Sequence, residues 1–146
     1  MRYLLLLLAL LGALDSTMAL REHYRVGASP CSINERWDCG VVNHSPYALI
    51  ASVPVAGIGI AGYLLLAFLA FRRRYRFFLG AAVAGLAFSL YLAHIEEQVL
   101  GVWCVYCAIS LGLISLLTLL AAGTVSFQAL RRNRRAPALP NSGLSS

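Results

Sequence analysis

The feature that most constrains the fold is a series of apolar runs, each close to the length that crosses a lipid bilayer. They cover residues 3–20, 49–71, 77–95 and 99–127, and a bilayer is spanned by about 20 apolar residues in a helix. With 60% hydrophobic and 12% charged residues, the chain lacks the polar surface of a soluble domain. The alternating segments of about ten residues that mark membrane β-barrels do not occur. We therefore predict an all-α integral membrane protein, a bundle of four transmembrane helices.

The first apolar run has two interpretations. Arg2, the apolar residues after it and the small-residue site Thr17-Met18-Ala19 fit a cleaved signal peptide. The same residues fit a retained first helix with Asp15 near its outer end. The pattern alone leaves both interpretations open.

Arginine placement predicts the orientation of the bundle. All 12 basic residues other than histidine are arginines. Dense clusters at 72–76 and 131–135 follow the second and fourth runs, and such clusters favour the cytoplasmic side. The loop 21–48 and the turn before the last run are then extracytoplasmic. The acidic residues fall on this side too, and we expect the last two to be solvated: Asp15, Glu22, Glu35, Asp38, Glu96 and Glu97.

The chain has four cysteines, and this topology brings all of them to one extracytoplasmic face. Cys104 and Cys107 open the last run, where a spacing of three puts both thiols on one helix face. A helix N-terminus favours a thiolate, so the pair indicates redox exchange. Cys31 and Cys39 lie in the polar loop. A mobile pair could meet a soluble protein thiol and a fixed pair a membrane-dissolved acceptor, with transfer through mixed disulfides.

Other interpretations of the cysteines remain. Four cysteines allow three disulfide connectivities. They could be structural staples, or apolar packing residues. They could also bind zinc or copper in a sensor or transporter, although the first spacing is wide for a metal site. Two further motifs carry less: residues 57–62 fit G-x-G-x-x-G but follow no strand, so close helix packing is the better interpretation, and Asn43-His44-Ser45 has the form of a glycosylation acceptor.

These motifs together resemble the vitamin K epoxide reductase (VKOR) family, as a bacterial single-domain homologue. The resemblance covers about residues 10–125. It rests on the following features: the spacing of Cys31 and Cys39, Ser45 six residues later in Ser-Pro-Tyr-Ala, Val53-Pro54, Cys104-Val105-Tyr106-Cys107, and Ala13-Leu14-Asp15-Ser16. It implies that the first helix is retained and that the spans enclose a membrane quinone, ubiquinone or menaquinone.

The resemblance also implies an electron path. A reduced thioredoxin-fold (DsbA-like) protein attacks the Cys31–Cys39 disulfide, with the mixed disulfide at Cys31. Cys39 then attacks Cys104 and frees Cys107, the thiolate that faces the quinone. The chain ends too soon after its last run for a fused thioredoxin-like domain, so we expect a separate partner. The expected setting is a bacterial inner membrane with periplasmic cysteines.

The resemblance implies less about the remaining site residues. Ser45 matches a family serine near the quinone headgroup, while capping of the following helix is an equal alternative. His94 is either an interfacial polar residue or a quinone contact. Leu111 stands where vertebrate members have a tyrosine, and residues 49–71 hold no asparagine, so activity on vitamin K epoxide is in doubt. Residues 128–146 are expected to form a basic and then disordered cytoplasmic tail.

Overall fold

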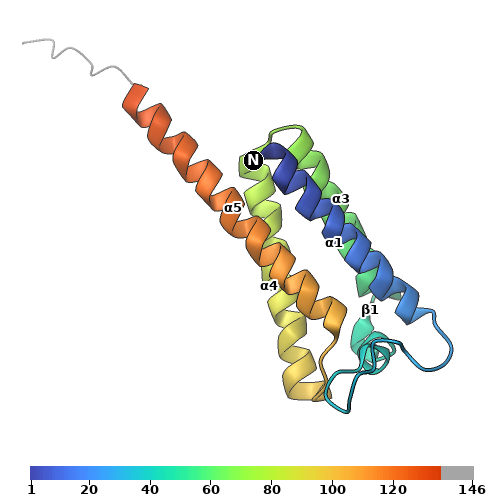
Figure 1. Ribbon diagram of the computed structural model, residues 1–146. Coiled ribbons are helices and arrows are strands. Elements are labelled where there is room, and N and C mark those ends of the chain that lie inside the picture. Colours follow the sequence, from blue (N-terminus) through green and yellow to red (C-terminus); the bar gives the residue numbers. More distant parts are fainter. Residues whose placement is uncertain (136–146) are drawn as a thin grey trace, which may run out of the picture.

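The computed structural model describes residues 1–135, and most of these are helical (Figure 1). Three helices are long and apolar enough to cross a membrane: α1 (Arg2–His23), α4 (Tyr75–Ile95) with the π-helical turn η2 (Glu96–Leu100), and α5 (Val105–Arg135). A further apolar helix, α3 (Val55–Phe71), has 17 residues. The class predicted from the apolar runs, a helical membrane protein, is confirmed at this level.

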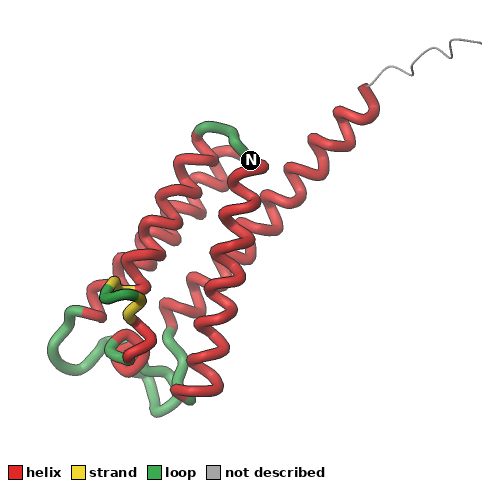
Figure 2. Tube along the Cα trace, turned by 180° about the vertical axis from the view of Figure 1, so that it is seen from behind, coloured by secondary structure: helices red, strands yellow, loops and turns green. Residues whose placement is uncertain are grey.

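The helices pack as two neighbouring pairs that share one core. α1 lies along α3, α4 lies along α5, and α1 also contacts α5 (Figures 1 and 2). Between them lies a buried apolar cluster with small residues at close approaches: Leu5, Ala9, Ala13, Tyr63, Leu66, Ala67, Ala70, Phe78, Ala82, Ile114, Leu117 and Ala121. Large apolar side chains such as Leu7, Leu64 and Leu119 remain exposed. An apolar outer surface of this kind suits lipid rather than water.

The second apolar run does not begin as a helix. Residues Leu49–Ile50 (β1) and Val53–Pro54 (β2) form a two-stranded hairpin that pairs Leu49 with Pro54 and Ile50 with Val53. Its two turn residues, Ala51 and Ser52, have φ angles of 49° and 67°, the left-handed values that tight hairpins require. Helix α3 starts at Val55 rather than at Leu49 because Pro54 ends the hairpin and stands directly before its first residue.

The last run also starts differently from its pattern. Its first residues complete η2, and Gly101 then takes a left-handed conformation with φ 66° that ends the turn. Helix α5 begins at Val105 and continues to Arg135, past the predicted end at Phe127. The segment 136–146, predicted to be disordered, lies outside the described residues.

The loop between α1 and β1 is built around a short helix, α2 (Cys39–Asn43), and a 3-10 turn, η1 (Pro46–Ala48). Asp38 caps α2, because its Oδ1 accepts hydrogen bonds from the amides of Gly40 at 2.8 Å and Val41 at 3.2 Å. The Ser32 hydroxyl also donates to Asp38, at 2.7 Å. That bond, followed by the two amide bonds, lowers the pKa of Asp38 below its usual value. The cap fixes the start of α2, where Cys39 lies.

Gly12 tests the contact between α1 and α3. A Cβ atom there would overlap the ring of Tyr63 on α3, whereas one at Gly57 on the same pair of helices meets nothing within 4 Å. We predict that Gly12→Ala lowers the free energy of unfolding by about 1–3 kcal/mol, the usual cost of overpacking. Thermal unfolding in detergent checks this, with Gly57→Ala as the matched control. Equal melting temperatures for the two variants would contradict the packing described.

Candidate active site

All four cysteines lie in one cluster at the loop end of the bundle. Cys31 and Cys39 form a disulfide with their Cα atoms 5.6 Å apart, while Cys104 and Cys107 are free thiols. Cys39 and Cys104 have no exposed surface, and Cys31 is 9% exposed. The apolar side chains around these sulfurs come from both the loop and the start of α5: Val42, Leu100, Val102, Val105 and Tyr106. The fold therefore brings the loop pair against the Cys-x-x-Cys pair.

A main-chain pairing holds the loop against the last span. Trp37 forms a parallel bridge with Trp103. The Trp103 amide donates to the Arg36 carbonyl at 2.8 Å, and the Asp38 amide donates to the Trp103 carbonyl at 3.1 Å. The two indole rings also lie close, with centroids 6.2 Å apart. Since Cys39 follows Trp37 by two residues and Cys104 follows Trp103 by one, the pairing brings these two cysteines into the same buried cluster.

Cys104 and Cys107 occupy the first turn of α5. The Cys104 carbonyl accepts the Ala108 amide at 3.0 Å, so Cys104 stands at the N-cap and Cys107 lies within the first turn. The Cys104 amide donates to Glu96 Oε2 at 3.0 Å, and Glu96 is only 3% exposed. The expectation that Glu96 is solvated was therefore wrong. Its carboxyl is buried because it accepts a backbone amide that the break at Gly101 leaves without a helical partner.

The surroundings of Cys104 favour its thiolate. A hydrogen bond with the Cys107 thiol lowers the pKa of Cys104, and the backbone amides of Cys107 and Tyr106 act in the same direction. Burial and the charge of Glu96 oppose them without reversing the shift. A thiol of the pair that ionises easily was predicted from the helix N-terminus. In this structure it is the pKa of Cys104 that is lowered.

Asn43 links the two cysteine pairs. Its side-chain amide donates to the Cys39 carbonyl at 2.9 Å and contacts the Cys104 sulfur at 3.7 Å, and the residue is 7% exposed. An amide donor beside a sulfur stabilises the thiolate form. The sequence offered one sign of this role, because a residue four positions after Cys39 shares its face if the segment is helical. By its sequence motif alone, Asn43 is only the first residue of a possible glycosylation acceptor.

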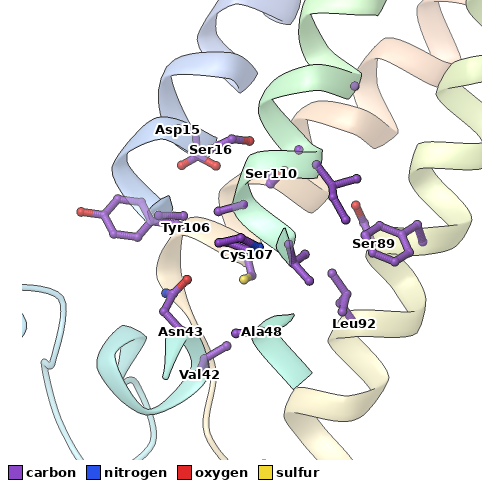
Figure 3. Close-up of a pocket in the computed structure, with 18 of the residues that line it drawn as sticks. Asp15, Ser16, Val42, Asn43, Ala48, Ser89, Leu92, Tyr106, Cys107 and Ser110 are labelled. Carbon is purple, nitrogen blue, oxygen red and sulfur yellow. The ribbon is translucent and has the colours of Figure 1, made fainter. Parts of the chain in front are cut away.

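A cavity of about 350 Å³ opens between the helices, on the helix side of the cysteine cluster. Its lining comes from α1, α3, α4, α5 and the loop and is mostly apolar. Cys107 is among the lining residues and Cys104 is not. In the close-up, Cys107 lies between Asn43 and Val42 on one side and Asp15 and Ser16 on the other (Figure 3). Such a cavity, apolar with a few convergent polar groups, is typical of a small-molecule site.

The weaker site predictions have different outcomes in the structure. Ser45 lines the cavity and is 8% exposed. Its hydroxyl donates to the Val42 carbonyl at 2.8 Å and makes no cap bond to η1. His94 is exposed and does not belong to the cavity lining. The histidine that does is His23, whose Nδ1 lies 2.5 Å from the Asn43 carbonyl.

Metal binding by the cysteines finds no support in residues 1–135. Within that range no group of three or more histidine, cysteine, aspartate or glutamate side chains is placed to hold a metal ion. The disulfide between Cys31 and Cys39 also leaves only two thiols free.

The model of the vitamin K epoxide reductase family matches residues 3–122, which include α1, the loop, all four cysteines and most of α5. No curated protein matches the chain.

The hydrogen bond between the Cys107 and Cys104 side chains should control the pH at which Cys104 ionises. Replacing both loop cysteines with serine prevents disulfide exchange and leaves Cys104 and Cys107 as the thiols to be titrated. In that background, Cys107→Ala removes the largest cause of the lowered pKa, so the Cys104 thiolate should form only at higher pH. Thiolate absorbance in the ultraviolet measures this, and Cys107→Ser, which keeps a donor, should shift the titration less. If Cys104 ionises at the same pH in Cys107→Ala and Cys107→Ser, the hydrogen bond from residue 107 does not lower the pKa of Cys104.

Proposed function

Because the chain belongs to the vitamin K epoxide reductase family, whose members are oxidoreductases, we propose that it is a quinone-coupled thiol oxidoreductase that reoxidises a thioredoxin-fold protein and so supports disulfide formation. One observation carries the proposal. Cys39 and Cys104 are fully buried in the same cluster, with Asn43 bonded to both residues, while Cys107 lines the cavity.

The accessible surface suggests which loop sulfur meets the partner. Cys31 retains some exposure, at 9%, whereas Cys39 has none. A reduced DsbA-like protein therefore attacks Cys31, breaks the Cys31–Cys39 bond and forms a mixed disulfide at Cys31. The second partner thiol then displaces Cys31, which leaves an oxidised partner and a reduced loop pair. Cys39 lies next to Cys104 and attacks it when the Cys104–Cys107 pair is disulfide-bonded.

The second half of the reaction takes place at the cavity. Exchange with the loop pair re-forms Cys31–Cys39 and leaves Cys104 and Cys107 as two thiols, which is the state described here. A bound quinone supplies the capacity to accept two electrons and two protons. Cys107 faces the cavity, and Cys104, with its lowered pKa, lies beside it. Closing the Cys104–Cys107 disulfide would release two electrons and two protons, which a quinone held in the cavity would accept.

The same proposal includes a four-span topology. Helix α3 has 17 residues, about 26 Å of helix, which is at the lower limit for a span. It runs beside α1 for most of its length (Figure 1). The residues 72–74 after α3 and 131–134 near the end of α5 are exposed, far from the cysteines along their helices. The positive-inside rule then supports periplasmic cysteines in a bacterial inner membrane.

Retention of the first helix belongs to this topology. Leu5, Ala9 and Ala13 of α1 are buried in the shared core, and Asp15 and Ser16 line the cavity. Removal of α1 as a signal peptide would expose the core between α3 and α5 and open the cavity to lipid. These contacts favour α1 as a permanent part of the bundle.

A structural protein with two stapling disulfides is the main alternative. Such a protein would need no exchange between the two cysteine pairs and no quinone in the cavity. Trapping the transfer between Cys39 and Cys104 separates it from the relay.

We predict that Cys107→Ala accumulates a Cys39–Cys104 disulfide. Cys104 attacks Cys39 and displaces Cys31, and Cys107 is no longer present to attack Cys104 and release Cys39. This species frees the Cys31 thiol, which can then attack the disulfide of an oxidised DsbA-like partner and hold that partner in a mixed disulfide. Alkylation of free thiols followed by mass spectrometry of non-reduced peptides identifies both species. The matched control is Cys104→Ala, which cannot form the interpair bond and should keep Cys31–Cys39. Recovery of Cys31–Cys39 alone from both variants would support the stapled protein and refute the relay.

A further inference from the structure

Asp15 is a buried acid that the proposed relay does not use. It lies on α1, is 9% exposed and lines the same cavity as Cys107. Its Oδ2 atom is the buried side-chain oxygen or nitrogen that has no hydrogen-bond partner among the described residues. Burying a carboxylate without partners costs far more than burying the neutral acid. An unpaired carboxyl beside a cavity therefore indicates a group that a ligand completes.

Glu22, on the same helix, shows what a structural buried acid looks like in this protein. It is 5% exposed, yet its Oε2 accepts the Ser29 hydroxyl at 2.7 Å and its Oε1 pairs with Arg25 at 3.3 Å. Both of its oxygens have partners that belong to the loop. Asp15 has no comparable compensation for its Oδ2, so a purely structural role does not account for it.

Two other polar groups near Asp15 either form hydrogen bonds or pack against a neighbouring helix. The Tyr63 hydroxyl bonds to Ser110, with 2.9 Å to its carbonyl and 2.8 Å to its Oγ. The Ser16 hydroxyl packs against Gly59, where a Cβ atom would lie 2.9 Å from Ser16 Oγ. Asp15 Oδ2 is thus the buried polar atom of this wall that lacks a partner among the described residues, and Figure 3 places Asp15 across from Asn43, with Cys107 between them.

We propose that Asp15, in its protonated form, donates a hydrogen bond and then a proton to one carbonyl oxygen of the quinone that the Cys104–Cys107 pair reduces. This inference rests on the proposed function. Oxidation of the dithiol forms one S–S bond and releases two electrons and two protons, and the quinone takes up both pairs to become a quinol. In the transfer, the O–H bond of Asp15 breaks as a quinol O–H bond forms. Asp15 regains its proton from those that the thiols release, so the overall balance is unchanged.

The chain allows a direct spectroscopic test, because Asp15 and Asp38 are its two aspartates. Asp38 is capped by amides and has a lowered pKa, so it is ionised at neutral pH. In full-length protein labelled with ¹³C at the aspartate side-chain carboxyl, a C=O stretch of a protonated acid must therefore come from Asp15. We expect this infrared band at neutral pH, and we expect decylubiquinone to shift it. Absence of the band, or a band that decylubiquinone does not move, would overturn the proposal even if variants fail to fold.

Kinetics of Asp15→Asn supply the second readout. The amide keeps the size and a hydrogen-bond donor but has no acidic proton. Loss of a general acid typically costs about 100-fold or more, so kcat for decylubiquinone reduction should fall by at least about 10-fold even if solvent protons substitute in part. The KM should change by less than about threefold because the donor remains, and thiol exchange between the pairs should not change. The matched control is Thr17→Val on the same helix, an exposed position whose hydroxyl bonds only to the Ala13 carbonyl.

The outcomes distinguish this inference from the function on which it rests. If the wild-type protein does not reduce decylubiquinone with electrons from its thiols, the proposed function fails. If the wild type does so and Asp15→Asn has the same kcat, only the role of Asp15 is refuted. A variant with raised KM and unchanged kcat would make Asp15 a binding group and refute its role as proton donor.

Discussion

The backbone pairing between Trp37 and Trp103 is the constraint on which the rest of the site depends. Two hydrogen bonds tie the loop segment around Trp37 to the segment just before α5. The disulfide and the Asp38 cap shape the loop internally, but neither fixes it to the bundle. Other bonds tie the loop to α1, from Ser29 to Glu22 and between His23 and the Asn43 carbonyl, but they do not reach the start of α5. With the pairing between Trp37 and Trp103, Cys39 and Cys104 share one buried cluster, the arrangement that the proposed exchange between the pairs needs.

The site divides its chemistry between an outer and an inner part. Cys31 is the loop sulfur with residual exposure, and Cys107 is the one that lines the cavity. Cys39 and Cys104 lie between them, excluded from water. In the proposed relay, burial of Cys39 and Cys104 would protect a reactive thiolate from competing oxidants. Asn43 and Glu96 hold the same pair in position by hydrogen bonds to Cys39 and Cys104, so the polar groups in this dry region are satisfied rather than left exposed.

The sequence predicted the features that depend on composition and local spacing. Apolar runs identified the long helices, and the two cysteine pairs with the arginine clusters predicted that four sulfurs meet at one end. The sequence did not predict features that depend on where the chain turns or on residues far away in the sequence. The hairpin at 49–54 looks like the start of a helix because all its side chains are compatible with one. From the sequence, Glu96 looks solvated. Its burial depends on the left-handed Gly101 and on the return of the chain to Cys104, which no local pattern indicates. Asn43 has no local signal at all unless α2 is known to be a helix.

The account requires that electrons from a dissolved protein reach the cavity only through the loop pair. The most direct measurement is an anaerobic single turnover in lipid vesicles, with a reduced thioredoxin-fold protein in stoichiometric amount and decylubiquinone as acceptor. We predict one quinol for each disulfide formed in the partner, and no quinol when Cys31 and Cys39 are both replaced by serine. Quinol formation at an unchanged rate in the double variant would contradict the account, because the partner would then be reducing Cys104 and Cys107 without the loop.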